Sequence, residues 1–487
     1  MMHTTYLLTF AILHCSGSAT PAVTPRTEHK KPNILFILAD DLGYGEVGCF
    51  GQELIQTPNI DKLAIEGLML TSHYAGSPVC ASSRCTLLTG KHTGQAIVRN
   101  NRELGGWGPE EPEGQFPLPT STPTVSSALQ EMGYATGAFG KWGLGGPNTS
   151  GLPNDHGFDE FYGYLCQRVA HNYYPTYLWK NKEKEMLHGN DTWFSAHQKM
   201  DATKSYEQFQ SETYAPDRIL EEAVHFIDKH AEEPFFLYFA STIPHVALQI
   251  PDKELDLYPL DWDEEPYLGD KGYLPHPRPR AAYAAMITRF DNEVGTLLAA
   301  LRRNGVAGNT IIIVTSDNGP SWVGGVDLEF FNSSGGLRGR KAQLFEGGIK
   351  VPTIVWWPNH IASNTKNETP TAFWDWYPTL IALSGSEFSE TDGVSLLPLF
   401  AGGALPERGL YWEYGNVQAY REGNWKLIRF NKKGNIEVML FNLKNDPNER
   451  TNLAEKNPEI VLQLTKKAMA SRTTSNDFPS FLDKEGM

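Results

Sequence analysis

The stretch Asn33–Ala39 reads NILFILA, and Asp40 and Asp41 follow it directly. An apolar run without polar alternation is typical of a strand that is covered on both faces. The stretches Phe235–Ala240 (FFLYFA) and Thr310–Ser316 (TIIIVTS) have the same character. Strands of this kind occur in parallel sheets between layers of helices, so the three stretches predict an α/β fold.

Helical patterns stand between these strands. Thr57 followed by Pro58 indicates a helix start and predicts a helix that runs toward Leu70. The same pair at residues 122–123 predicts a second helix that ends near Gly133. A long helix is expected before Thr310–Ser316, because apolar residues there keep helical spacing: Met286, Phe290, Val294, Leu297 and Leu301. The alternation predicts a large, mostly parallel mixed sheet sandwiched by helices.

The pattern changes after about residue 385. Residues 351–357 (VPTIVWW) predict one more strand of the large sheet, whereas the later short segments predict antiparallel strands and a helix, at 409–413, 425–430, 438–441 and 458–471. We therefore expect a large α/β domain over residues 30–385 and a smaller C-terminal α+β subdomain with a short antiparallel sheet over residues 386–487.

The N-terminus resembles an export signal. Residues 6–13 (YLLTFAIL) are apolar, and the small residues Gly17 and Ala19 follow. This pattern predicts a signal peptide over residues 1–19 and a secreted or periplasmic protein, with a disordered arm as the alternative. The run is too short to span a bilayer, and no later segment is longer, so no membrane span is expected.

Composition excludes several classes of protein. The chain has 487 residues and a formal charge of −15, from 42 Lys and Arg against 57 Asp and Glu. It is long enough to bury a large core without disulfides, and its five cysteines are few for a disulfide scaffold. Nucleic acids and anionic membranes need a basic surface, so binding to either is not expected.

Two acidic pairs occupy matching places. Asp40 and Asp41 follow one buried strand, and Asp317 and Asn318 follow another. Ligands gather at the carboxyl ends of parallel strands, so both pairs can reach one crevice. Three carboxylates and an amide suit a hard cation such as Ca²⁺ or Mg²⁺ better than zinc. Each pair by itself also fits a turn or a helix cap.

Cys80 stands at the start of a short predicted helix in residues 77–90, SPVCASSRCTLLTG, which Gly90 ends. Arg84 follows one turn later on the same side. The positive end of the helix and this arginine are expected to lower the pKa of the Cys80 thiol or to hold an anion. The alternative is a buried structural cysteine.

Six motifs together resemble the signature of the type I sulfatases in the alkaline-phosphatase-like superfamily. They follow the order of that family and include the Cys80 segment itself. In this sequence they are ILADDLGYG at 37–45, CASSR at 80–84 with LLTGK at 87–91, GKW at 140–142, IPH at 243–245, TSDNG at 315–319 and GRKAQLFEGGIKVP at 339–352.

The resemblance implies a sulfatase that hydrolyses a sulfate ester. A maturation enzyme would convert Cys80 to formylglycine, and the hydrated form would be the nucleophile. Ca²⁺ would bind residue 80 and the two acidic pairs, Asp40, Asp41, Asp317 and Asn318. Arg84 would orient the nucleophile, His245 would protonate the leaving alcohol, and two lysines would bind the sulfate, Lys141 and Lys341.

The segment at residues 166–179, CQRVAHNYYPTYLW, is the candidate for substrate binding. Aromatic faces with nearby donors suit a sugar ring, and similar segments occur in bacterial exo-acting carbohydrate sulfatases. The candidate residues are Arg168, His171, Asn172 and Tyr173. We expect a terminal sulfated sugar of an oligosaccharide or a monosaccharide, of galactose type. The alternative is a packed lid whose aromatics belong to the core.

Two positions depart from the family pattern. Ser82 stands where Pro or Ala is usual in the modification motif, and Gly143 stands where many members have histidine. Two rival functions remain: a phosphomonoester or phosphonate hydrolase of the same superfamily, and a glycan-binding relative without activity. Cys80 with Arg84 and the single visible ligand set favour the sulfatase.

Overall fold

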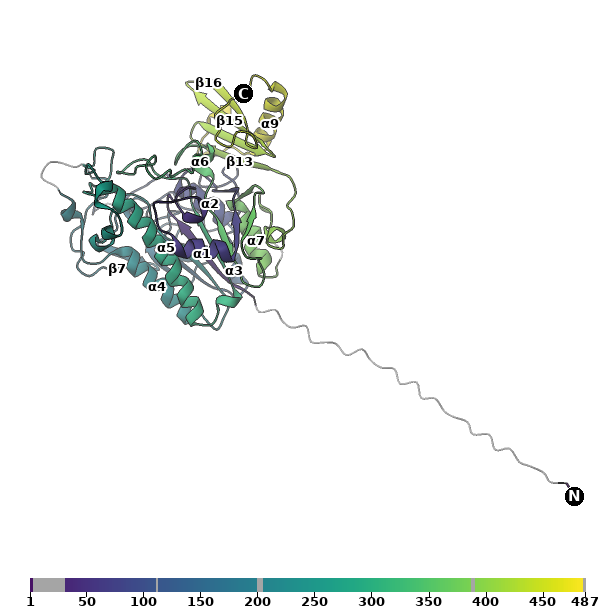
Figure 1. Cartoon of the computed structure of the whole chain (residues 1–487), viewed down its shortest axis with the longest axis horizontal. Coiled ribbons are helices and arrows are strands. Elements are labelled where there is room, and N and C mark those ends of the chain that lie inside the picture. Colours follow the sequence, from purple (N-terminus) through teal and green to yellow (C-terminus); the bar gives the residue numbers. More distant parts are fainter. Residues whose placement is uncertain (3–30, 111–112, 199–204, 387–389, 485–487) are drawn as a thin grey trace. The chain divides into compact units, whose positions relative to one another are not determined.

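Strand β1 (Asn33–Ala39) lies inside a ten-stranded sheet, hydrogen-bonded in parallel to β8 (Phe235–Ala240) and β9 (Thr310–Ser316) (Figure 1). The strand order is β11-β2-β10-β9-β1-β8-β4-β5-β6-β7, and the five strands from β9 to β5 are parallel. The other strands of this sheet are β2 (Leu68–Leu70), β4 (Ala135–Lys141), β5 (Glu160–Tyr164), β6 (Tyr177–Lys180), β7 (Glu183–Met186), β10 (Ile354–Trp356) and β11 (Thr365–Asn367). The predicted mostly parallel mixed sheet is confirmed.

The computed structural model describes residues 1–2, 31–110, 113–198, 205–386 and 390–484. The chain from Lys31 onward forms one unit, which contains all the described helices and strands. Residues 3–19 of the predicted signal peptide lie outside the described residues.

Each face of the sheet carries its own core. Alternate side chains of a strand point to opposite faces, and in β1 the odd-numbered ones pack with one group of helices and the even-numbered ones with another. The first group is α1 (Pro58–Glu66), α4 (Ala215–Lys229) and α5 (Pro279–Arg303). The second is α2 (Cys80–Thr89), α3 (Val125–Glu131) and α7 (Trp376–Leu383). The sheet is therefore sandwiched by helices, as predicted.

Two predicted helix boundaries are wrong. The helix from Pro58 ends at Glu66, because the buried triplet Leu68–Leu70 pairs with β10 as strand β2. Helix α3 begins at Val125, since the hydroxyl of Thr124, and not that of residue 122, accepts the Ser127 amide at 3.1 Å.

The C-terminal part forms a separate four-stranded antiparallel sheet, β13 (Gly409–Tyr414), β14 (Val417–Glu422), β15 (Trp425–Lys432) and β16 (Asn435–Asn442). Strand β14 was not predicted. One face of this sheet packs under α9 (Pro458–Ala470), and the other packs on the large α/β part through Trp412 and Trp374. The remaining short elements are β3 (His73–Tyr74), α6 (Glu346–Ile349), β12 (Thr371–Ala372) and α8 (Leu397–Phe400).

The described part of the chain has no helix that is long and apolar enough to cross a membrane. Its cysteines are free: Cys49, Cys80, Cys85 and Cys166.

Candidate active site

The predicted site residues meet at one edge of the large sheet. Because β9, β1, β8 and β4 are parallel neighbours, their carboxyl ends lie side by side. The residues carried there by these strands and the loops that follow them are Asp317 and Asn318 after β9, Asp40 and Asp41 after β1, His245 after β8, and Lys141 at the end of β4.

Three buried carboxylates are each held by a different cation. Lys141 Nζ lies 2.5 Å from Asp40 Oδ2, and Lys341 Nζ lies 2.7 Å from Asp41 Oδ2. Arg84 donates from Nε and Nη2 to the third carboxylate, Oδ2 of Asp317, at 3.0 and 2.8 Å. Buried carboxylates are stable as anions only with such partners, so the cluster requires all three cations.

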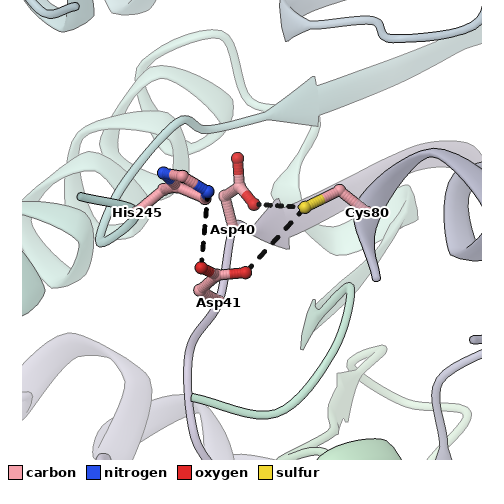
Figure 2. A group of neighbouring side chains, drawn as sticks. All are labelled: Asp40, Asp41, Cys80 and His245. Atoms are coloured by element: carbon pink, nitrogen blue, oxygen red, sulfur yellow. Dashed lines mark hydrogen bonds and ion pairs between the residues drawn. The ribbon is translucent and has the colours of Figure 1, made fainter. Parts of the chain in front are cut away.

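Cys80 is the first residue of α2 and points at this cluster (Figure 2). Its Sγ lies 3.2 Å from Asp40 Oδ1 and 3.9 Å from Asp41 Oδ1. The predicted lowering of its pKa is wrong: burial, with Asp317 and Asp40 nearby, raises the pKa of the thiol well above its ordinary value. Carboxylates beside the sulfur outweigh the positive end of the helix, so the unmodified side chain is a neutral thiol.

Arg84 links the helix to the strand that carries a predicted sulfate-binding lysine. Besides its two bonds to Asp317, its Nη1 donates to the backbone oxygen of Lys141 at 2.6 Å. The arginine therefore holds the Lys141 backbone in place and stabilises the negative charge of Asp317. Its side chain has no exposed surface.

His245 faces the same carboxylates from the other side. Its Nε2 lies 3.5 Å from Asp41 Oδ2, and its Nδ1 contacts the backbone oxygen of Val246 (Figure 2). A carbonyl only accepts hydrogen bonds, so the proton of the neutral ring belongs on Nδ1. Burial and the nearby Lys341 lower the pKa of His245 to about 4.

The donor set fits a divalent cation. Ligand atoms of Asp40, Asp41, Cys80 and His245 all lie within 4.8 Å of one another. Asn318 donates from Nδ2 to Asp41 Oδ1 at 2.7 Å, and its own Oδ1 is buried without a hydrogen-bond partner in the described part of the chain. An orphaned amide oxygen beside ionised carboxylates is chemistry that Ca²⁺ satisfies.

The electrostatics of the carboxylates agree with this fit. Burial alone would raise the pKa of Asp40, but Lys141 and His245 bring it below its usual range. Burial and the charge of Asp40 raise the pKa of Asp317. Opposite shifts in neighbouring carboxylates are typical of groups that repel each other at close range, and a bound divalent cation would reduce that repulsion.

His171, one of the predicted substrate residues, stacks directly on His245. The ring centroids are 3.8 Å apart and the planes differ by 6°. Its Nδ1 lies 2.7 Å from His197 Nε2, while its Nε2 is buried and has no partner among the described residues. Tyr273 packs edge-on against His171, with 5.7 Å between ring centroids, and at a tilt of 45° against His197, with 4.5 Å between centroids. His171 therefore has one nitrogen available for a ligand.

The other three predicted substrate residues are placed differently. Arg168 is partly exposed and donates to Glu103 Oε2 at 3.2 Å. Asn172 uses both ends of its amide on backbone groups, and the Tyr173 hydroxyl contacts the backbone oxygens of residues 242 and 245. Tyr173 thus supports the loop that carries His245, whereas Asn172 holds its own segment against Phe194. The predicted contact of both residues with substrate stays a prediction.

Gln167 occupies the space beside Gly143, where many family members carry histidine. Gly143 has φ +81°, and a Cβ there would lie 2.4 Å from Gln167 Nε2. This amide nitrogen is buried and has no partner among the described residues. Sequence reasoning missed Gln167, His197 and Tyr273, because each reaches the site from a loop without a repeating pattern.

Comparison with protein families identifies two matches. The family described as Sulfatase matches residues 32–386. The family described as N-sulphoglucosamine sulphohydrolase, C-terminal, matches residues 340–474. The first match contains every predicted catalytic and metal-binding residue, and the second spans the C-terminal sheet.

Known proteins resemble the chain over most of its length. It is 30% identical to arylsulfatase A of Bos taurus, covering 94% of this chain and 89% of that protein. It is also 30% identical to N-acetylgalactosamine-6-sulfatase of Sus scrofa, over 79% and 69%. Among solved structures, Ps i-CgsB superposes with a TM-score of 0.74 at 28% identity, covering 91% of this chain and 94% of that one. A second structure of Ps i-CgsB is a complex with k-i-k-neocarrahexaose.

Substituting Gly143 tests the packing against Gln167. Gly143→Ala and Gly133→Ala both place a side chain at a positive φ, near +82°, but a Cβ at Gly133 meets nothing within 4 Å. The positive φ should lower the free energy of unfolding of both variants by about 1–2 kcal/mol. Only Gly143→Ala should show a larger loss when this free energy is measured by denaturant unfolding. Adding Gln167→Ala should remove that excess. Equal losses in the two single variants would show that Gln167 does not constrain position 143.

Proposed function

Since this chain belongs to the sulfatase family and is a sulfuric ester hydrolase, we propose that it removes a sulfate ester from a terminal sugar of a sulfated glycan, with Ca²⁺ and with Cys80 converted to formylglycine. The observation that best supports the proposal is the set of buried carboxylates beside residue 80, with the partnerless oxygen of Asn318 among them. This set of carboxylates supports both parts of the proposal, the binding of a cation and the modification of residue 80.

The residues divide into a cation-holding set and a sulfate-holding set. Ca²⁺ would be held by the oxygens of Asp40, Asp41, Asp317 and Asn318 and by residue 80, and when bound it supplies Lewis-acid and orienting chemistry to the ester. Formylglycine at position 80 supplies a hydroxyl nucleophile when hydrated. Arg84, fully buried behind both, keeps Asp317 and the end of β4 in place.

Lys141 and Lys341 are the proposed partners of the sulfate oxygens. Both ammonium groups already contact the carboxylates that face residue 80, so a sulfate bound there lies within reach of both. The Lys141 side chain has no exposed surface, whereas 13% of the Lys341 side chain is exposed. The sulfate therefore enters past Lys341. Positive charge on both sides stabilises the charge that spreads over the sulfuryl group during transfer.

His245 is the proposed donor of the proton to the leaving sugar oxygen. The contact of Nδ1 with the Val246 carbonyl leaves Nε2 as the nitrogen that faces the site. Because the neutral ring carries its proton on Nδ1, donation from Nε2 requires the imidazolium form, with a proton on both nitrogens. The stacked ring of His171 covers the face of His245 and limits the approach of water.

The sugar is proposed to meet His171 and Arg168. The partnerless Nε2 of His171 can bind a hydroxyl group next to the sulfate ester, and Arg168 is partly exposed. The relative named N-acetylgalactosamine-6-sulfatase and the complex of Ps i-CgsB with k-i-k-neocarrahexaose support a sugar substrate. They also support the galactose-type preference that we expect from the sequence.

Maturation and export complete the proposal. A formylglycine-generating enzyme would act on Cys80 before the protein folds, since the thiol is fully buried in the folded chain. Export through a signal peptide at residues 1–19, to a secreted or periplasmic location, remains a proposal from the sequence.

Release of sulfate together with the mass of residue 80 tests the proposed reaction. Protein made in its own host should carry an aldehyde at residue 80 in the tryptic peptide, and it should release sulfate from position-defined sugar sulfates. Cys80→Ala should release none, because it cannot be modified, while keeping its fold. Active protein with only cysteine at this position, or release of phosphate and no sulfate, would contradict the proposal.

Replacing His171 tests the sugar contact. His171→Ala should lower kcat/KM for a glycan substrate by about tenfold, the size of one lost hydrogen bond to a buried group. It should lower kcat/KM for a small aryl sulfate much less, because that substrate has no sugar hydroxyl. Asn172→Ala, whose amide serves the backbone, is the matched control and should affect both substrates equally. Equal losses with His171→Ala would remove this residue from sugar recognition.

A further inference from the structure

The loop that carries Lys341 is closed at its base and anchored at its tip. Gly347 N donates to the Arg338 oxygen at 2.7 Å, which joins the two ends of the loop. At the tip, Lys341 N donates to the oxygen of Pro320, and Ala342 N to that of Pro78, at 3.1 and 2.9 Å. The tip therefore contacts the chain just after Asn318 and just before Cys80.

One residue of the C-terminal part binds both ends of this loop. Glu449, which follows the last strand of the small sheet, accepts from Arg338 Nη1 through its backbone oxygen at 2.8 Å. Its side chain accepts from the Glu346 amide at 2.6 Å. The base of the loop is thus fixed to the C-terminal part through Glu449, and the tip is fixed to the large α/β part.

A buried lysine holds this arrangement together. Lys426, in β15, has Nζ 2.8 Å from Glu346 Oε1 and 2.9 Å from Glu449 Oε1, and all three side chains are buried. The hydroxyl of Tyr74 binds the other oxygen of Glu346 at 2.6 Å. Two buried carboxylates this close together need the cation between them. Without Lys426, the two carboxylates would repel each other more strongly, with Arg421 and Lys350 still near Glu346.

We propose that Lys426 and Glu449 are positioning residues for Lys341, so that the C-terminal sheet sets the strength of sulfate binding. The inference rests on the role proposed above for Lys341. Glu449 fixes the base of the loop, Lys426 balances the charge of that contact, and the short closed loop transmits the position to the Lys341 ammonium. Neither residue is predicted to touch substrate.

A double-mutant cycle measures the coupling. Kinetics of sulfate ester hydrolysis would be compared for the wild type, Lys426→Met, Lys341→Ala and the double variant. Lys426→Met should lower kcat/KM about tenfold in the wild type and less than about twofold in Lys341→Ala, which is the range of coupling for groups in one network. Inorganic sulfate, used as a competitive inhibitor, should also bind Lys426→Met about tenfold more weakly.

Controls separate this role from a loss of stability. Arg408→Met removes a buried ion pair with Asp375 that also joins the C-terminal segment to the large part, but it lies away from the loop, so its inhibition by sulfate should match the wild type. If Lys426→Met does not fold, Glu449→Gln serves instead, because it keeps an acceptor for the Glu346 amide and removes only the charge.

The outcomes distinguish this inference from the proposed function. Equal losses from Lys426→Met in both backgrounds, or unchanged sulfate inhibition in a folded variant, would overturn the positioning role. If kcat/KM is not lowered by Lys341→Ala, the result would instead contradict the proposed role of Lys341 in the reaction.

Discussion

The structure around the site depends on the burial of three carboxylates at one edge of the sheet. Asp40, Asp41 and Asp317 lie close enough to repel one another, and burial removes the water that would screen them. Each is offset by a cation from a different element: Lys141 from β4, Lys341 from the closed loop and Arg84 from α2. The same charges that would act on sulfate thus bring five segments of the chain together.

This arrangement reconciles an acidic protein with an anionic substrate. The formal charge of −15 describes the whole chain, and it makes a broad polyanion-binding surface unfavourable. The cations that would meet sulfate are instead buried in pairs with carboxylates, and only Lys341 is partly exposed. Its position is determined from outside the α/β part, through Glu449 and Lys426, so the small C-terminal sheet is part of the site.

Sequence patterns were sufficient where one local signal dominates. The strand bounds of Asn33–Ala39, Phe235–Ala240 and Thr310–Ser316 agree with prediction, because a fully buried strand is apolar throughout. Because the strand ends were predicted correctly, so was the position of the two acidic pairs at one edge of the sheet. Where two local signals competed, prediction failed: at Leu68–Leu70 strand pairing overrode a helical pattern.

Tertiary surroundings could not be predicted in the same way. The raised pKa of Cys80 depends first on burial and then on carboxylates forty or more positions away in the sequence, and a helix-dipole argument includes neither. Gln167 and His197 belong to no sequence motif. Their place in the site is evident only from the structure, where Gln167 packs against Gly143 and His197 contacts His171.

Calcium dependence tests the central claim, that this carboxylate cluster binds a divalent cation for sulfate ester hydrolysis. Chelated, verified metal-free protein should lose sulfatase activity and regain it on titration with Ca²⁺. Asn318→Ala, which removes the partnerless oxygen, should need at least about tenfold more Ca²⁺ for half of the recovery, as is typical when a metal site loses a supporting group. Full activity of the metal-free wild type would contradict the account.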